Sequence, residues 1–187
     1  MPGLDQTRQF VPLKIAVLTV SDTRSLADDK SGSTLAERIE QAGHALAGRA
    51  IVTDDVEAIR VQLRAWIADP AIDAIITTGG TGFTGRDVTP EAVEALFEKR
   101  MEGFSTAFHM VSYPKIGSST IQSRATAGVA NATFIFCVPG SPGACRDAWD
   151  EILVHQLDYR FRPCNFVELM PRLDEHLRRP KAKGATV

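Results

Sequence analysis

Residues 72–97 read IDAIITTGGTGFTGRDVTPEAVEALF, which is an apolar run, a glycine-rich loop and an amphipathic segment in that order. The β-branched run from Ile72 to Thr78 predicts a strand buried on both faces. Thr89 can cap the helix that follows, and Pro90 can open it as its first residue. A strand, a glycine loop and a helix in this order are typical of an open α/β sheet, which binds ligands where its strands end.

The rest of the chain repeats this alternation of apolar runs and amphipathic segments. Strands are also predicted at residues 14–20, 50–52 and 133–138. Helices are predicted around residues 35–42, ended by Gly43, and over 56–67, 101–113 and 144–157. Strands that alternate with helices of this length predict a mostly parallel sheet covered on both faces.

Composition and length limit the class of protein. The chain has 187 residues, of which 44% are hydrophobic and 24% are charged, values of an ordinary soluble domain and not of a disordered or collagenous chain. We expect no membrane segment, because no apolar run approaches the roughly 20 residues that span a bilayer, and no secretory signal. Cys137, Cys145 and Cys164 form neither a C-x-x-C pair nor a zinc-finger spacing. A cytoplasmic, reduced protein without zinc is expected.

The net charge of −2 argues against a nucleic-acid partner, since such domains are usually strongly basic. From Arg172 to the end, however, five residues are basic and two are acidic. We therefore divide the chain into an N-terminal arm (1–13), a single α/β domain (14–173) and a basic C-terminal tail (174–187). The tail is interpreted as a solvated terminus, with anion binding as the alternative.

Residues 79–88, GGTGFTGRDV, are called the glycine loop below. Its glycines let the backbone adopt positive φ and approach an anion closely, so that amide groups can converge on a phosphate. Two known motifs nearly fit. The G-x-G-x-x-G of dinucleotide-binding folds is excluded because Arg-Asp-Val-Thr-Pro separates the third glycine from the helix, and the P-loop because Arg86-Asp87 stands where Lys-Ser/Thr is required.

Asp87 is the main candidate for chemistry in this loop. An aspartate before a helix is usually a cap or a solvated charge, but Thr89 is already available as a cap. The functional interpretation makes Asp87 a ligand of Mg²⁺ or a partner for a polar heterocycle. Asp54 or Asp55 offers a second carboxylate at another strand end, and Asp22 follows the first strand. Parallel strands would bring these ends to one edge of the sheet.

Weaker candidates come from two other segments. Pro139, Gly140 and Ser141 follow the last predicted strand, where a plain tight turn is the alternative. Ser118, Ser123 and Arg124 offer hydroxyls and a guanidinium to a phosphate, although polar loop residues are common.

Between Lys14 and Leu173 the sequence resembles the molybdopterin-binding proteins of molybdenum cofactor biosynthesis, the MogA/MoaB family, to which the gephyrin G domain also belongs. TVSDTR, the DDKSG loop, TTGGTG…RDVTPEA, the SR of IQSRATAG, and PGSP carry this resemblance. AGHALAGRAIV, EGFSTAFHMVS and RPCNF are most similar to the MoaB branch.

The resemblance implies a three-layer α/β/α domain that assembles as a trimer, or as a hexamer built from trimers. It implies transfer of AMP from Mg-ATP to molybdopterin, giving adenylyl-molybdopterin and pyrophosphate, and contacts with other proteins of the pathway. Asp87 and Asp54 match the two functional carboxylates of the family and are the expected Mg²⁺ ligands. With the residues above, the candidate ligands of the pterin and ATP are Ser21, Asp22, Gly79, Gly80, Thr81, Gly82, Arg86, Thr89, Pro90, Glu91, Ser118, Ser123, Arg124, Pro139, Gly140 and Ser141.

Two alternatives from other classes remain open at this point. A non-catalytic carrier would bind molybdopterin and gain neither affinity nor product from ATP. A nucleotide-binding structural protein would bind ATP without the pterin.

Overall fold

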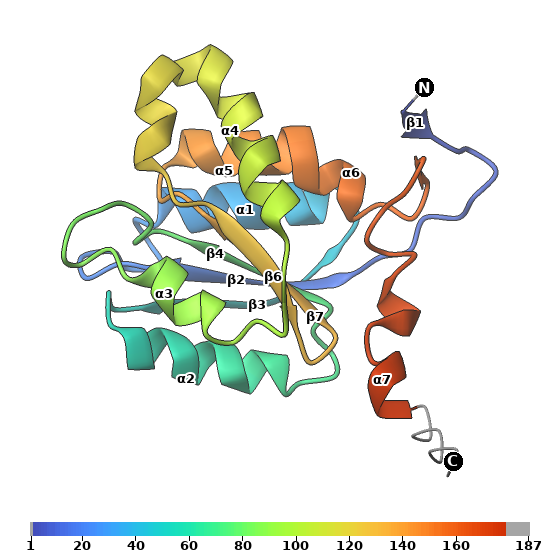
Figure 1. The fold of residues 1–187 in the computed structure, drawn as a ribbon, viewed down its shortest axis with the longest axis horizontal. Helices are drawn as coiled ribbons and strands as arrows, with labels where there is room; N and C mark the ends of the chain where they lie inside the picture. Colours follow the sequence, from blue (N-terminus) through green and yellow to red (C-terminus); the bar gives the residue numbers. More distant parts are fainter. Residues whose placement is uncertain (1, 179–187) are drawn as a thin grey trace, which may run out of the picture.

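The computed structural model describes residues 2–178. Its centre is a six-stranded sheet in the order β3-β2-β4-β7-β6-β5 (Figure 1). The strands are β2 (Lys14–Val20), β3 (Ala45–Val52), β4 (Ala74–Thr78), β5 (Lys99–Arg100), β6 (Thr126–Ala130) and β7 (Thr133–Val138). The first four in the sheet order, β3 to β7, run parallel, and only β6 and β5 pair antiparallel with their neighbours. The predicted mostly parallel sheet is confirmed.

Helices cover both faces of this sheet, so the domain has three layers (Figure 1). On one face lie α1 (Lys30–Gln41), α4 (Glu102–Ile116), and the helical run of α5 (Pro142–Ala148), the π-helical turn η2 (Trp149–Leu153) and α6 (Val154–Gln156). On the other face lie α2 (Val56–Ile67) and α3 (Thr89–Glu94). The predicted α/β/α architecture is confirmed.

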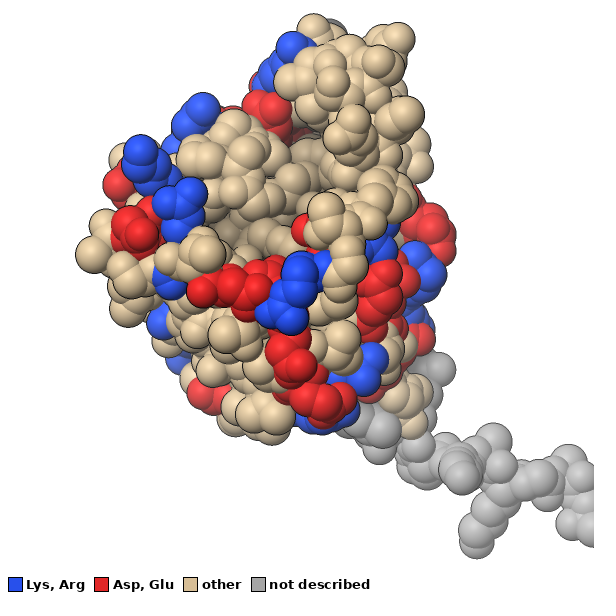
Figure 2. Space-filling view, turned by 90° about the vertical axis from the view of Figure 1, so that its left-hand side faces the viewer, with Lys and Arg blue, Asp and Glu red and all other residues tan. Residues whose placement is uncertain are grey.

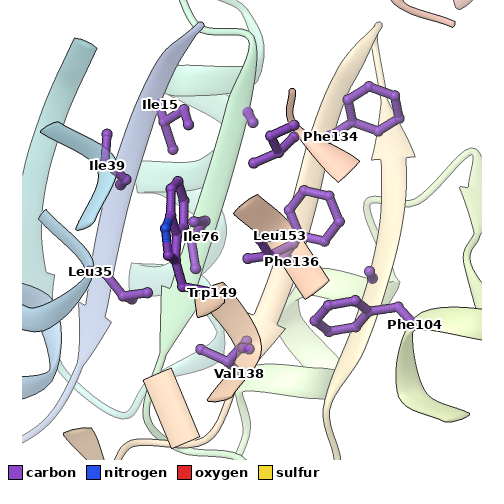
Figure 3. Close-up of a cluster of buried hydrophobic side chains, with 14 of the residues drawn as sticks. Ile15, Leu35, Ile39, Ile76, Phe104, Phe134, Phe136, Val138, Trp149 and Leu153 are labelled. Carbon is purple, nitrogen blue, oxygen red and sulfur yellow. The ribbon is translucent and has the colours of Figure 1, made fainter. Parts of the chain in front are cut away.

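Alternation along the strands builds a separate hydrophobic core on each face. Ile15 and Val17 of β2 point to the side of α1, α4 and α5, where Trp149 and the phenylalanines of β7 and α4 gather (Figure 3). Ala16 and Leu18 point to the side of α2 and α3. Because successive residues of a strand face opposite sides, every position of such a doubly covered strand must be apolar, which explains its continuous hydrophobic sequence.

Several element boundaries differ from those predicted. β3 begins at Ala45 and not at Ala50, because the small and charged residues of this edge strand hide it from hydropathy alone. β6 was not predicted at all. The last long helix begins at Pro142, two residues before the predicted start, because Ser141 accepts a hydrogen bond from the amide of Ala144 as its N-cap.

The expected cap of α3 is wrong. Thr89 is the first residue of this helix, and its N-cap is Val88, which makes no side-chain cap. Pro90 is accordingly the second helical residue. The reason is that the Thr89 amide donates to the Gly80 carbonyl at 3.0 Å, which draws the start of the helix against the glycine loop.

The first and last described elements, β1 (Gly3–Leu4) and α7 (Glu175–Arg178), lie at the opposite side of the domain from the glycine loop (Figure 1). In the expected N-terminal arm, β1 pairs with β8 (Phe161–Arg162). Near the C-terminus, η3 (Met170–Arg172) and α7 are short, and residues 179–187 of the expected basic tail lie outside the described residues. No helix within residues 2–178 has the length and apolar character needed to cross a membrane.

Candidate functional site

The loops that follow the four parallel strands lie at one edge of the sheet (Figure 1). Figure 2 looks onto this edge and shows a hollow with a largely uncharged floor, beside which acidic and basic side chains gather. This is where parallel α/β sheets place their ligands, and most of the predicted site residues are on these loops.

The glycine loop leaves β4 through two residues with positive φ, Gly79 at 99° and Gly80 at 61°. A side chain at Gly79 would overlap the carbonyl of Val20. A Cβ on Gly140, from the loop after β7, would stand 2.9 Å from the Gly79 Cα. Two loops thus meet the end of β2 with only backbone between them, and glycine is required for this approach.

Asp87 closes the glycine loop on itself. Its Oδ2 accepts hydrogen bonds from the Thr84 amide at 2.8 Å and the Thr84 hydroxyl at 2.6 Å. These contacts, the hydroxyl foremost, lower the pKa of Asp87, and the Gly82 amide and Arg124 contribute in the same direction. Asp87 is therefore an ionised carboxylate held in a fixed position.

Asp54 lies beside it in a different environment. Its Oδ2 accepts the Asp22 amide at 2.9 Å, and its own amide donates to Asp22 Oδ1 at 3.1 Å. Burial raises the pKa of Asp54, and the nearby carboxylates of Asp22 and Asp87 raise it further. Three predicted carboxylates therefore share one region of the site. Asp54 is the one whose ionised form is disfavoured by its surroundings in the folded protein.

The structure distinguishes Asp54 from its neighbour. Asp55 is the N-cap of α2 and accepts the Ala58 amide at 2.8 Å. Of the two aspartates that the sequence offered at this strand end, Asp54 contacts the site, whereas Asp55 starts the helix.

Arg86 joins the loops after β2 and β4. Its guanidinium makes a forked ion pair with the carboxylate of Asp22, with distances of 2.6 to 3.0 Å. The pair holds the pKa of Asp22 below its usual range. The side chains of Arg86 and Asp22 are 64% and 38% exposed, so the contact bridges the two loops at the surface.

Thr89 is fully buried behind the loop, and Pro90 is buried beside it. The Thr89 hydroxyl has no hydrogen-bond partner, and a Cβ on Gly80 would overlap it and lie 3.0 Å from Asp54 Oδ1. Thr89 therefore packs against the back of Gly80, which sets the position of Gly80 next to the Asp54 carboxylate.

Arg124 and Glu91 are brought to the loop from the side of β6 and α3. Arg124 forms an ion pair with Glu91 and donates to the carbonyls of Thr81, Gly82 and Asp87. Sequence reasoning assigned this guanidinium to a phosphate, whereas here it binds backbone carbonyls.

The turn after β7 also contributes to the edge. The carbonyl of Pro139 accepts the Thr78 hydroxyl at 3.0 Å, and that of Gly140 accepts the Ser31 hydroxyl at 2.9 Å. Behind Gly79 a cavity of about 130 Å³ opens between this turn and α1. It is lined by Thr19, Val20, Ser21, Arg24, Asp29, Lys30, Ser31, Thr78, Gly79, Gly140 and Pro142.

This cavity contains residues that the site prediction missed. Arg24, Lys30 and Ser31 belong to residues 24–32, RSLADDKSG, whose DDKSG part carries the family resemblance but supplies none of the predicted site residues. The signal available was its position directly after β2, the same kind of strand end that placed Asp22 and Asp54.

Two predicted residues lie elsewhere. Ser118 is exposed on η1 (Gly117–Gln122). Ser123 lines a separate cavity of about 280 Å³ together with Glu94 and Arg100.

The donor set fits a magnesium ion that arrives with a phosphate substrate. Mg²⁺ commonly takes one or two protein carboxylates and completes its octahedron with phosphate oxygens and water. The hydrogen bonds above engage Oδ2 of both Asp54 and Asp87. No group of three or more His, Cys, Asp or Glu in residues 2–178 could hold a metal by itself.

Comparison with known proteins identifies the family. Residues 16–159 match the family described as "Probable molybdopterin binding domain". Molybdenum cofactor biosynthesis protein B of Escherichia coli K12 is 51% identical over 158 residues, or 84% of this chain and 93% of that protein. The protein of the same name from Bacillus subtilis is 42% identical over 163 residues, covering 86% and 96%.

Solved structures give the same result. A crystal structure of Molybdenum cofactor biosynthesis protein B has a TM-score of 0.78 at 40% identity, covering 80% of this chain and 94% of that one. The tungsten cofactor synthesizing protein MoaB from Pyrococcus furiosus has a TM-score of 0.69 at 29% identity, covering 90% and 98%. The resemblance drawn from the sequence motifs is confirmed: the chain belongs to the molybdopterin-binding domain family, together with proteins named Molybdenum cofactor biosynthesis protein B.

Proposed function

We propose that the chain is a molybdopterin adenylyltransferase, which transfers AMP from Mg-ATP to the terminal phosphate of molybdopterin. A phosphate oxygen of the pterin forms a bond to the α-phosphorus of ATP, and the α–β bridging bond breaks, so that pyrophosphate leaves with the electron pair. The observation that carries the proposal is the pair of carboxylates, Asp54 and Asp87, beside a glycine loop at the carboxyl edge of the sheet.

Such a transfer requires little covalent chemistry from the protein itself. The chain must hold two anions in line and balance the charge that develops on the phosphoryl oxygens. Asp54 and Asp87 would hold the magnesium that ATP brings, which neutralises the phosphates. The backbone at Gly79 and Gly80 lets a phosphate approach without side-chain obstruction. Arg24 and Lys30 supply positive charge at the neighbouring cavity, suited to a second anionic group.

A second function, binding and carrying molybdopterin without catalysis, is favoured by a different observation. The two arginines that act electrostatically on these carboxylates are engaged within the protein, Arg86 by Asp22 and Arg124 by loop carbonyls and Glu91. A transferase then has to take its positive charge from other groups, such as Mg²⁺ and the basic residues of the neighbouring cavity, whereas a carrier needs none for catalysis.

We further propose that the chain works in the cytoplasm as a homo-oligomer, a trimer or a hexamer built from two trimers, in contact with other proteins of the pathway. Free thiols at all three cysteines suit a reducing compartment. Exposed apolar side chains on α4 and η1, among them Met110, Tyr113 and Ile121, suit a protein interface.

The test is a single-turnover incubation of the purified chain with molybdopterin, ATP and Mg²⁺, followed by chromatography for the adenylylated pterin. We expect product that depends on Mg²⁺, and its loss in Asp87→Asn with the fold intact. Asp73→Asn is the matched control, because Asp73 accepts the Lys14 amide at the start of β2, the far edge of the sheet. Pterin retained by the wild-type chain without product would support the carrier, and unchanged turnover in Asp87→Asn would refute the role of Asp87.

A further inference from the structure

Arg124 makes several hydrogen bonds with the glycine loop, and the adenylyl transfer proposed above assigns no role to them. It lies between η1 and β6, and its Nε donates to the Gly82 carbonyl at 2.8 Å and to the Thr81 carbonyl at 3.3 Å. Its Nη2 donates to the Asp87 carbonyl at 2.7 Å, and Nη1 forms the ion pair with Glu91. The backbone amide of Arg124 adds a bond to the Thr81 carbonyl at 3.2 Å.

These acceptors lie at the two ends of one loop. Thr81 and Gly82 precede the exposed tip, and Asp87 follows it, so a single guanidinium joins the entry and the exit of the turn. The ring of the exposed tip residue Phe83 lies over the same guanidinium at 5.4 Å. A planar group with five donors can reach three carbonyls and a carboxylate together, whereas the point charge of a lysine cannot.

The direction of the carbonyls also decides where the amides point. In a planar trans peptide the N–H is opposite to the C=O, so the Thr81 carbonyl that faces Arg124 turns the Gly82 amide away from it. That amide is one of the groups that lower the pKa of the Asp87 carboxyl. Arg124 therefore acts on Asp87 in two ways, through the Asp87 carbonyl and through Gly82, which packs against the Asp87 carboxylate.

We propose that Arg124 is a positioning residue, which holds the glycine loop in the shape that fixes the Asp87 carboxylate, and that it is not a ligand of a substrate phosphate. The effect on turnover rests on the proposed function, whereas the effect on the loop does not. The engagement of all three guanidinium nitrogens within the protein carries this assignment. A loop released from Arg124 would leave Asp87 ionised but misplaced, and a shift of about 1 Å at a catalytic group can lower a rate about 100-fold.

The test compares Arg124→Lys with the matched control Arg100→Lys. Arg100 lines the same cavity as Arg124 but pairs with Glu94 and Glu102 and not with the loop. Amide hydrogen exchange of the ligand-free proteins is followed in peptides that cover residues 79–88. We expect exchange in this loop to be about tenfold faster in Arg124→Lys, since a local opening free energy is lost, and unchanged in Arg100→Lys.

Turnover is measured on the same two variants. In Arg124→Lys we expect kcat to fall about 100-fold while KM for ATP changes by less than about threefold, because no ground-state contact with ATP is removed. Arg100→Lys should keep both values. Should Arg124→Lys fail to fold, Arg124→Gln, which retains the apolar stem and an amide donor, takes its place.

Three outcomes would overturn the proposal. Unchanged hydrogen exchange in residues 79–88 would show that Arg124 does not stabilise the loop. Unchanged kcat would show that turnover does not depend on the contact between Arg124 and the loop. A raised KM with unaltered kcat would make Arg124 a substrate ligand. If the wild-type chain forms no adenylyl-molybdopterin, the proposed function fails, and hydrogen exchange still tests the contact between Arg124 and the loop.

Discussion

Gly80 is the residue on which the glycine loop, α3 and the loop after β3 converge. Its φ of 61° is unfavourable for any side chain, and a Cβ would overlap the Thr89 hydroxyl and press on Asp54 Oδ1 at 3.0 Å. We expect Gly80→Ala to lower the free energy of unfolding by about 2 kcal/mol and to abolish turnover. Gly85→Ala is the control, because nothing lies within 4 Å of a Cβ there. Denaturant unfolding of both variants checks this. Equal unfolding free energies for Gly80→Ala and Gly85→Ala would show that the loop accommodates a side chain at position 80 without cost.

Asp54 illustrates the cost of a functional charge. Because burial raises its pKa above that of the unfolded chain, its ionisation destabilises the folded state. This cost is absent below the unfolded pKa, grows as the pH rises toward the folded pKa, and persists above it. We expect Asp54→Asn to raise Tm at pH 7 by about 2 °C, with the partial exposure of the group keeping the gain small. The same variant should have no turnover.

Thermal unfolding of Asp54→Asn and the wild-type chain at pH 7 and pH 3 measures this difference. The gain should shrink at pH 3, where both chains carry a neutral side chain. A lower Tm at pH 7 would mean that the Asp22 amide bond needs the charge of Asp54, contrary to the expectation.

At the scale of elements, the start of α2 separates a structural aspartate from a functional one. Asp55 caps this helix through the Ala58 amide, and removing such a cap costs about 1 kcal/mol. We therefore expect Asp55→Ala to lower stability by that amount while turnover per folded molecule stays near wild type. Urea unfolding and the single-turnover assay together check this. Lost turnover at full stability would place Asp55 in the site and contradict the assignment.

The elements that the sequence predicted well are those whose patterns depend on burial alone. β2 (Lys14–Val20), β7 and α2 agree with the prediction to the residue, because both faces of the strands and one stripe of the helix are apolar. β6 has the sequence TAGVA, in which Gly128 leaves room for the ring of Phe97, so it carries little strand propensity of its own. Its hairpin turns at Asn131 and Ala132, both at positive φ, without the glycine that usually marks such a turn.

The site residues that could be predicted from the sequence are those that directly follow a predictable strand. Asp22, Asp54 and Asp87 follow three strands, and parallel order brings strand ends together. What a residue does with its neighbours could not be predicted in the same way. The partners of Arg124 in the glycine loop are about 40 residues away in sequence, and the Thr89 hydroxyl faces Gly80 only because of how α3 packs on the loop.

For the whole molecule, the face formed by α4 and η1 tests the proposed assembly. Met110 and Ile121 are 71% and 69% exposed and line an open groove of about 650 Å³ with Tyr113. Fully burying one such side chain contributes about 1.5–3 kcal/mol, so several of them at a subunit contact would stabilise an oligomer. A lysine ammonium in the same contact would be desolvated without a partner.

We therefore expect the double variant Met110→Lys, Ile121→Lys to sediment as a single chain of about the wild-type mass of 20.3 kDa, with an unchanged circular dichroism spectrum. Val61→Lys is the matched control, since Val61 is 64% exposed on α2, across the sheet from α4, and should leave the assembly intact. Analytical ultracentrifugation over a range of concentrations measures all three. A wild-type chain that stays monomeric would refute the oligomer itself. A double variant that remains a trimer or hexamer would instead move the interface away from α4, and the exposed apolar side chains there would need another partner.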